Sequence, residues 1–352
     1  MRKPVPPQPA TAQRYAGERA PALLTTHPVL KPETIGFLLA PRFSMLAFTC
    51  AVEPLRVANR LAQCELYQWQ TISVEGLPVA ASNRMSVIAD RSIRERVDYA
   101  RVAVCAGFEP ETLYDARVAA WLRQIARAGV ALGAIDTGSF VLAYAGLLDG
   151  YRAATHWESL EGLRSQYPKV AIAPDLFAVD RGRFTCAGGT AALDMMLHVV
   201  RLSHGHRLAA AVAEQFIHTR MREPREHQRM GPRERQGVHE AWLATMIEAM
   251  EANLEEPLSM RELCAAAGVT PRRCERGFRR QLRVSARRYY LNLRLQRART
   301  FLQYTNLPVL DAAVACGFRS VAHFSRSYKA WSGVPPSADR ASMHQGVPPI
   351  LS

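Results

Sequence analysis

The chain has 352 residues, 48% of them hydrophobic, and a formal net charge of +14 at pH 7, and this length is sufficient for two domains with separate cores. Its seven cysteines are odd in number and none lies in a CxxC pair, which argues against a disulfide framework or a zinc site. No hydrophobic run is long enough to span a membrane and no signal-peptide pattern is present, so we expect a cytoplasmic protein without membrane partners.

Residues 1–32 are rich in proline and show no periodicity, which predicts a disordered tail. From residue 33 onward, short hydrophobic runs that suit strands alternate with amphipathic stretches that suit helices. Strands are predicted at 35–40, 67–74, 100–105 and 130–135, and helices at 45–61, 118–128, 140–145, 193–202 and 208–221. This alternation predicts an α/β domain over residues 33–221 with a mostly parallel sheet.

Two of the predicted turns from strand to helix combine glycine with polar residues, at Ala134–Phe140 and at Phe184–Leu193. In open α/β sheets, ligands bind beyond the carboxyl ends of the strands, near helix N-termini whose free N–H groups face outward. Both turns are expected at that edge. The alternative is that their glycines only permit tight turns.

Residues 222–237 are polar, highly charged and interrupted by Pro224 and Pro232, which predicts a linker. A C-terminal domain is expected at 238–340, followed by a tail at 341–352. Between Pro257 and Arg340 there are 16 Lys and Arg residues but only four Asp and Glu residues. Such a local excess forms either a solvated face or a phosphate-binding face, and its position favours nucleic acid.

This basic segment contains two similar units, each with a short Ala-rich helix, a glycine turn and a second helix that begins at a capping residue. Thr270 is predicted to cap the second helix of the first unit, with Pro271 at its first position, and Ser320 to cap that of the second unit. A helix over 286–304 would set the separation of the units. The pattern predicts an all-α tandem helix-turn-helix domain.

Each second helix is predicted to pack one face and present the other to a major groove. The expected DNA-binding residues are Arg272, Arg273, Arg276, Arg279, Arg280, Ser320, His323, Arg326, Ser327 and Lys329. Those expected to read bases are Arg272, Arg273, Arg276, His323 and Arg326. The sequence does not separate base contacts from phosphate contacts.

The C-terminal part resembles the AraC/XylS family of transcription regulators. The resemblance lies in the turn Gly317–Phe318, the run His323–Lys329 and the closing segment Gly333–Arg340. It implies sequence-specific binding to direct half-sites on double-stranded DNA, usually to activate transcription, with RNA polymerase as a further partner.

The α/β half resembles the ThiJ/PfpI-type class I glutamine-amidotransferase-like superfamily, and more closely the sensor half of GlxA-type AraC regulators. The matching residues are Phe43–Leu46, Glu53, Arg56–Arg60, Ala134–Phe140, Ala145–Gly150, Ala154–Trp157 and Cys186–Thr190. The resemblance implies a flavodoxin-like parallel sheet sandwiched by helices.

Enzymes of that superfamily carry a nucleophilic cysteine at the elbow after the central strand, where this chain has Asp136. The acid that relatives carry early in the first helix aligns with Ala47, although His156 remains. We therefore expect no catalytic residue, no cofactor and no metal. The alternative is a residual hydrolase or lyase fused to a DNA-binding domain.

A binding pocket is the expected use of this scaffold. An ionised Asp136 favours a cationic group, nearby helix N-termini favour a carboxylate, and an aromatic wall suits a quaternary ammonium. This combination indicates a small zwitterion, either an amino acid or a betaine-like compound. The expected ligand-binding residues are Asp136, Thr137, His156, Trp157, Phe43, Phe108, Gly188 and Gly189. Alternatively, Asp136 only caps the following helix, and His156 and Trp157 only pack.

Together these patterns predict a transcription regulator that responds to a small-molecule effector and forms a homodimer. Two other hypotheses stay open: an enzyme with a DNA-binding appendage, and a DNA binder that needs no ligand.

Overall fold

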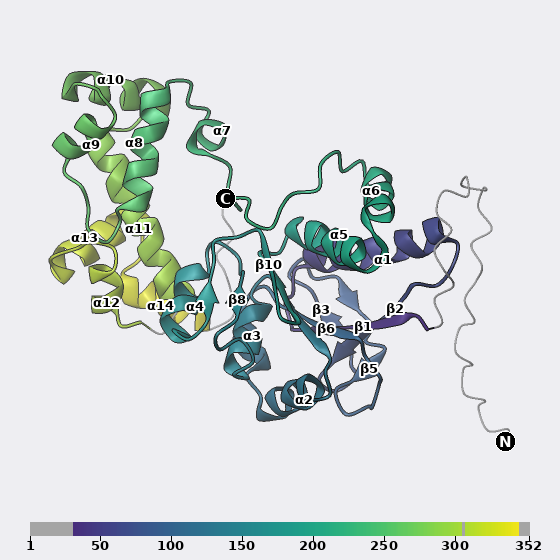
Figure 1. Cartoon of the computed structure of the whole chain (residues 1–352). Helices are drawn as coiled ribbons and strands as arrows, with labels where there is room; N and C mark the ends of the chain where they lie inside the picture. Colours follow the sequence, from purple (N-terminus) through teal and green to yellow (C-terminus); the bar gives the residue numbers. More distant parts are fainter. Residues whose placement is uncertain (1–30, 305–306, 345–352) are drawn as a thin grey trace.

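The computed structural model describes residues 31–304 and 307–344, so almost all of the predicted N-terminal tail and residues 345–352 lie outside the described residues. Figure 1 shows an α/β domain formed by the first part of the described chain and a helical unit formed by its C-terminal part. None of the helices in the described ranges is both long and apolar enough to cross a membrane.

The α/β domain is built on a seven-stranded sheet in the order β10-β11-β7-β6-β1-β2-β5. The strands are β1 (Glu33–Leu39), β2 (Tyr67–Ser73), β5 (Arg91–Ser92), β6 (Arg101–Cys105), β7 (Ala131–Ile135), β10 (Phe177–Asp180) and β11 (Arg183–Cys186). All neighbours pair in parallel except β10 and β11. Two small ribbons stand apart: β3 (Val79–Ala80) with β4 (Ser86–Val87), and β8 (Arg152–Ala153) with β9 (Ala171–Ile172).

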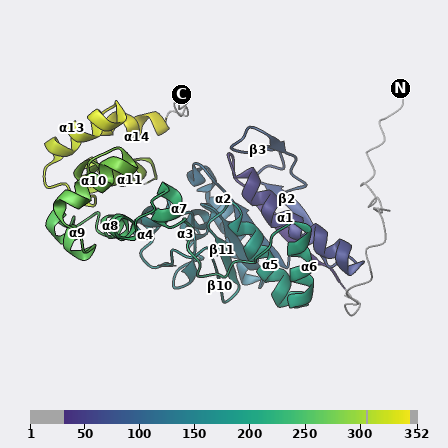
Figure 2. The same ribbon diagram turned by 90° about the horizontal axis from the view of Figure 1, so that it is seen from above.

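Helices cover both faces of this sheet, as the predicted α/β class requires (Figures 1 and 2). One face packs on α1 (Met45–Ala62), α5 (Ala191–His204) and α6 (His206–Gln215). The other packs on η1 (Pro110–Leu113), α2 (Ala116–Arg127), α3 (Gly138–Tyr144) and α4 (Leu160–Gln166). Alternate residues of β1 and β6 enter the two cores, which explains why these strands read as continuous hydrophobic runs.

The helical unit comprises α7 (Pro232–Gln236), α8 (Ala241–Ala252), α9 (Met260–Ala266), α10 (Pro271–Leu282), α11 (Ala286–Tyr304), α12 (Val309–Val314), α13 (Val321–Ser332) and α14 (Pro336–His344). It has two hydrophobic cores, one under α8–α10 and one under α12 and α13. Helix α11 contributes Tyr290 to the first core and Leu295 to the second, so it joins the two helix-turn-helix units.

The two predicted caps of the helical unit, at Thr270 and Ser320, are present, and the structure adds a third cap at Ser259. The Ser259 hydroxyl accepts a hydrogen bond from the Glu262 N–H, and Glu262 bonds back to the Ser259 N–H in a capping box. Thr270 caps α10, with Pro271 at its first position, and Ser320 caps α13. Helices α10 and α13 begin at the predicted residues because a cap is a local interaction that the sequence encodes directly.

The helices of the structure differ from the predicted ones in three places. Helix α6 ends at Gln215 rather than near residue 221, because Ile217 adopts a left-handed conformation with φ of 55° and is 87% exposed. Helix α8 was not predicted, although Leu243, Met246 and Ile247 share a buried face with helical spacing. Helix α14 continues to His344, past the predicted boundary at residue 340.

Candidate ligand site and nucleic-acid interface

The carboxyl ends of four parallel strands lie level with one another. Leu39 pairs with Cys105, Cys105 with Ile135, and Ile135 with Cys186. The loops that follow these strands therefore meet at one edge of the sheet, where ligands bind in folds of this class. The two turns predicted from their glycines, after β7 and after β11, are both at this edge.

Asp136 occupies the sharp turn between β7 and α3. Its backbone is left-handed, with φ of 62°, which costs a non-glycine residue about 1–2 kcal/mol and persists only when neighbours enforce it. The Asp136 N–H donates to the Cys186 carbonyl at 3.1 Å, and the Thr155 hydroxyl donates to the Asp136 carbonyl at 3.0 Å. The Thr137 hydroxyl donates to the Gly107 carbonyl at 2.7 Å. The elbow is thus tied to three neighbouring loops.

Two glycines make this elbow sterically feasible. A Cβ on Gly138 would lie 2.1 Å from the Val104 carbonyl oxygen, so only glycine lets α3 start this close to β6. A Cβ on Gly188 would lie 2.8 Å from the carboxyl group of Asp136. Gly188, predicted to bind ligand, therefore also closes one side of the elbow, whereas a Cβ on Gly189 would meet no atom within 4 Å.

Burial controls the charge of the elbow. It raises the pKa of Asp136 to about 7, with a further small increase from the nearby Glu158 carboxylate, while a hydrogen bond from the Thr137 N–H acts in the opposite direction. Protonated and ionised Asp136 are therefore comparably populated at neutral pH, which corrects the expectation of a fully ionised carboxylate. Burial also raises the pKa of Glu158 and lowers that of His156.

Two thiols lie beside the elbow on the flanking strands. Burial raises the pKa of Cys105 well above its usual value and that of Cys186 to about 12. Both cysteines are free and buried. Because the thiolate is the nucleophilic form, burial makes both thiols weak nucleophiles at neutral pH. No group of three or more His, Cys, Asp or Glu residues in the described chain is arranged to hold a metal ion.

The predicted aromatic wall is present only in part. Phe43 has no exposed surface and packs edge-on against Phe48, so its ring cannot contact a ligand and that prediction is wrong. Phe108 and Trp157 are 42% and 38% exposed. An arginine of this chain lies over each of these two rings. The guanidinium carbon of Arg42 lies 5.2 Å from the centroid of the Phe108 ring, and that of Arg229 lies 4.3 Å from the centroid of the Trp157 ring.

The helix N-termini offer less to a carboxylate than expected. The first N–H groups of α5, from Ala191 to Leu193, donate to the carbonyls of Gly188, Gly189 and Thr190. The hydroxyl of Thr137 is engaged with Gly107, as described above. The first N–H groups of α5 are therefore engaged within the chain and not free for a ligand carboxylate.

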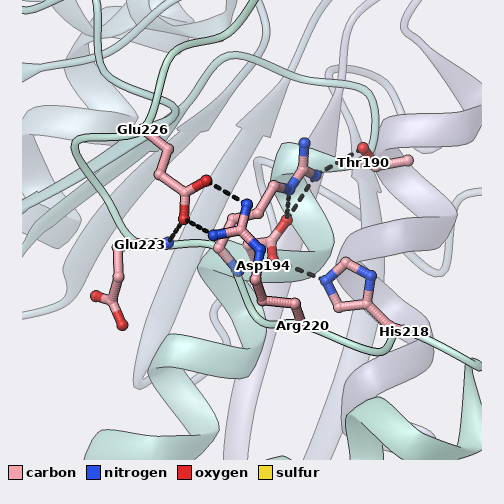
Figure 3. Close-up of polar contacts among 7 residues, drawn as sticks. Thr190, Asp194, His218, Arg220, Glu223 and Glu226 are labelled. Atoms are coloured by element: carbon pink, nitrogen blue, oxygen red, sulfur yellow. Dashed lines mark hydrogen bonds and ion pairs between the residues drawn. The ribbon is translucent and has the colours of Figure 1, made fainter.

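The segment after α6 runs back over the α/β domain, and we name residues 218–229 the strap. Figure 3 shows its first anchor, the carboxylate of Asp194, whose side chain is fully buried. His218 Nε2 lies 2.9 Å from this carboxylate, and Arg222 donates to it from both its backbone N–H and its guanidinium. Arg222 also donates to the Thr190 hydroxyl at 2.7 Å, beside the Gly188–Gly189 turn.

A second anchor lies at the other end of the strap. Gln228 Nε2 donates to the carbonyls of Thr155 at 2.9 Å and Asp175 at 2.7 Å. Since the Thr155 hydroxyl bonds to the Asp136 carbonyl, the elbow is two hydrogen bonds away from the strap. Residues 222–229 of the predicted linker therefore pack against the α/β domain instead of forming a free connection.

The five predicted DNA-binding arginines of the recognition helix α10 fall into two groups, those that form ion pairs within the chain and those that do not. Arg273 and Arg280 form ion pairs with Glu240, and Arg279 pairs with Glu275 at 2.7 Å. Arg272 and Arg276 are exposed and form no ion pair with any residue that the structure describes. These two are the most available for DNA.

The second recognition helix, α13, buries Phe324 and Tyr328 and exposes His323, Arg326 and Lys329. Ser320 accepts a hydrogen bond from the His323 N–H and is engaged as a cap, and Ser327 is half-buried. Both recognition helices lie on the part of the helical unit farthest from the sheet (Figures 1 and 2).

Sequence reasoning missed three residues of the candidate ligand site. Glu158 follows Trp157 directly and was detectable as a second acid near the elbow. Gln228 and Arg229 lie in a segment interpreted as a linker, and no local pattern shows that they return to Thr155 and Trp157.

Known proteins resemble this chain in both halves. The DJ-1/PfpI family matches residues 33–202, and the helix-turn-helix domain matches residues 263–342. The transcriptional regulator GbdR of Pseudomonas aeruginosa is 42% identical over 320 residues, covering 91% of this chain and 87% of its own length. The regulator CdhR of the same organism is 45% identical over 312 residues, covering 89% and 93%.

Among solved structures, a ThiJ/PfpI family protein from Pseudomonas syringae aligns with a TM-score of 0.51 at 19% identity, covering 73% of this chain and 99% of that chain. At this identity the likeness concerns the fold alone. The predicted resemblances are confirmed, and the chain belongs to the family of HTH-type transcriptional regulators in which a DJ-1/PfpI domain precedes an AraC-type helix-turn-helix domain.

Proposed function

We propose that the α/β domain of this DNA-binding regulator binds a small metabolite with a cationic group, such as a betaine or an amino acid, and does not transform it. The observation that carries this proposal is the elbow itself. It keeps the tight turn at Gly138 and Gly188, which in enzymes would expose a nucleophile, but it places a carboxyl group there.

The chemistry of the surrounding side chains supports a cation. Two carboxyl groups, Asp136 and Glu158, lie near one another, and an exposed aromatic ring, Trp157, directly precedes Glu158 in the sequence. A cation that binds here stabilises ionised Asp136 and gains both charge attraction and contact with the ring. His156 has a lowered pKa and so does not add a competing positive charge at neutral pH.

We further propose that α10 and α13 bind two successive major grooves, with Arg272, Arg276, His323 and Arg326 as the base-reading residues. Helix α11 has 19 residues and is therefore about 28 Å long, close to the roughly 34 Å between such grooves. Activation through RNA polymerase and a homodimer stay predictions that follow from the family.

A thermal-shift screen of the purified full chain against amino acids, betaines and polyamines tests the ligand proposal. We expect a betaine or an amino acid to raise Tm, and the substitutions Asp136→Ala and Trp157→Leu to abolish the shift while the variants stay folded. A screen in which no compound stabilises the wild-type chain would favour a ligand-free DNA binder. Turnover of an aldehyde or amide that Asp136→Ala abolishes would instead show an enzyme.

A further inference from the structure

The ring that would receive the ligand cation already carries a cation of the chain. The guanidinium carbon of Arg229 lies 4.3 Å from the centroid of the Trp157 ring, within the range of a cation–π contact. A ring face accommodates one cation at a time, because a second positive charge at the same distance is repelled. A ligand ammonium group on this face therefore requires Arg229 to leave it.

The guanidinium of Arg229 has fewer polar partners than that of Arg42, the other arginine over an aromatic ring of this site. Arg42, which lies over Phe108, also forms an ion pair with Glu109. Arg229 forms no hydrogen bond and no ion pair within 4 Å among residues 31–304 and 307–344. Although Arg229 is exposed over part of its surface, desolvation of its guanidinium and the neighbouring Arg235 lower its pKa.

Arg229 lies between the second anchor of the strap and the first helix of the helical unit. It directly follows Gln228, the residue that bonds the strap to the Thr155 carbonyl at the elbow. Shortly after it, Arg235 of α7 forms an ion pair with Glu251 of α8, in the helical unit. A displaced Arg229 would therefore free the end of the strap that leads into the DNA-binding helices.

We propose that Arg229 is an internal competitor for the effector: a ligand ammonium group displaces its guanidinium from Trp157, and this release of the strap reports ligand binding to the helical unit. The inference rests on the proposed ligand site and specifies how that site is regulated. Both ligand and guanidinium interact with the same ring, so the coupling needs no conformational change elsewhere in the sheet.

Calorimetric titration of the full chain with betaine (trimethylglycine) tests the competition. The key variant is Arg229→Gln. Its matched control is Arg225→Gln, which removes the same charge from an exposed arginine of the same strap. Removing a competitor worth about 0.5–1 kcal/mol predicts betaine affinity about 2- to 5-fold higher in Arg229→Gln and unchanged in Arg225→Gln. The isostere 3,3-dimethylbutanoate keeps the carboxylate of betaine but has a neutral tert-butyl group in place of the trimethylammonium. It should gain no affinity in either variant, because it lacks the positive charge.

The outcomes separate this inference from the ligand proposal. If betaine binding needs Asp136 and Trp157 but Arg229→Gln leaves it unchanged, the ligand site stands and the competition is wrong. Weaker binding in Arg229→Gln would also overturn it, since Arg229 would then be pairing with the ligand carboxylate. If betaine binds neither the wild-type chain nor Arg229→Gln, both proposals fail for this class of ligand.

Operator affinity provides a second readout. Ligand-free Arg229→Gln should shift DNA affinity in the same direction as betaine shifts the wild-type chain, and Arg225→Gln should not. A shift in Arg225→Gln of equal size would show a general charge effect on DNA binding and overturn the coupling. Circular dichroism and thermal melting of both variants confirm that each is folded before the comparison.

Discussion

The recognition helices and the elbow around Asp136 differ in where they place their charged groups. The recognition helices expose Arg272, Arg276 and Arg326, and none of them forms an ion pair within the described part of the chain. The elbow instead buries its titratable groups, so that Asp136 has a pKa of about 7 and is only partly ionised at neutral pH.

This difference matches the two kinds of partner that we propose. DNA is a long polyanion, and exposed arginines can attract it at a distance and release its counterions. A small metabolite offers few contacts, so a site gains more from groups already removed from water, where each interaction is stronger. The following substitutions test the comparison, starting with the largest expected effect.

Asp136→Asn tests the buried end. The raised pKa means that the folded chain keeps the Asp136 proton, so this group contributes stability below about pH 4 that is lost as the pH rises to about 7. Asp136→Asn should therefore match the wild type near pH 4 and exceed its stability by up to about 4 kcal/mol at pH 8. Urea unfolding across this range measures the difference. Asp149→Asn, an exposed acid of the same domain, is the control, and an equal pH-dependent gain there would contradict the assignment to the elbow.

Arg272→Ala and Arg276→Ala test the exposed end. Each should weaken operator binding by about 5- to 150-fold if the guanidinium reads a base, with little change in thermal stability. Fluorescence anisotropy at several salt concentrations separates the roles. A base contact relaxes specificity at one position, whereas a phosphate contact weakens all sequences and lowers the salt dependence. Arg127→Ala on α2 controls for net charge, and a loss of similar size there would show that total charge, not α10, governs binding.

Gly188→Ala and Gly189→Ala form a matched pair at the turn beside the elbow. Both glycines have positive φ, so each substitution should cost about 1 kcal/mol of stability in strain. Gly188→Ala should cost about 1–3 kcal/mol more, because its Cβ would meet the Asp136 carboxyl group. Chemical denaturation gives both values. Equal losses would mean that Asp136 moves aside without cost, and that the elbow is less tightly enclosed than its geometry indicates.

The ion pair between Glu161 of α4 and Arg297 of α11, at 3.5 Å, connects the α/β domain with the helical unit. Its removal should have the smallest effect of the substitutions considered. A partly exposed pair contributes at most about 1 kcal/mol. A double-mutant cycle of Glu161→Gln and Arg297→Gln should show coupling in the operator affinity measured with and without betaine. Arg164→Gln removes the partner of Glu161 within α4 and serves as the control. Absence of coupling in the cycle would leave the strap as the main connection between the domains.

The sequence by itself determined the parts of this protein that depend on local interactions. Caps at Thr270 and Ser320 act within three residues, so the starts of their helices could be predicted. The arginines of α10 follow the helical period around buried Cys274 and Phe278, so the basic face could be predicted as well.

Only the tertiary structure decided how the candidate ligand site is built. Phe43 and Phe108 look equivalent as aromatic residues in the sequence, yet one is fully buried and the other is exposed. The pKa of Asp136 depends mainly on its burial in the folded chain. Arg229 contacts Trp157, from which it is 72 positions apart in the chain, and it lies in a segment whose composition resembles a linker. Desolvation and long-range packing have no signature in a short stretch of sequence, because they arise only when distant segments come together.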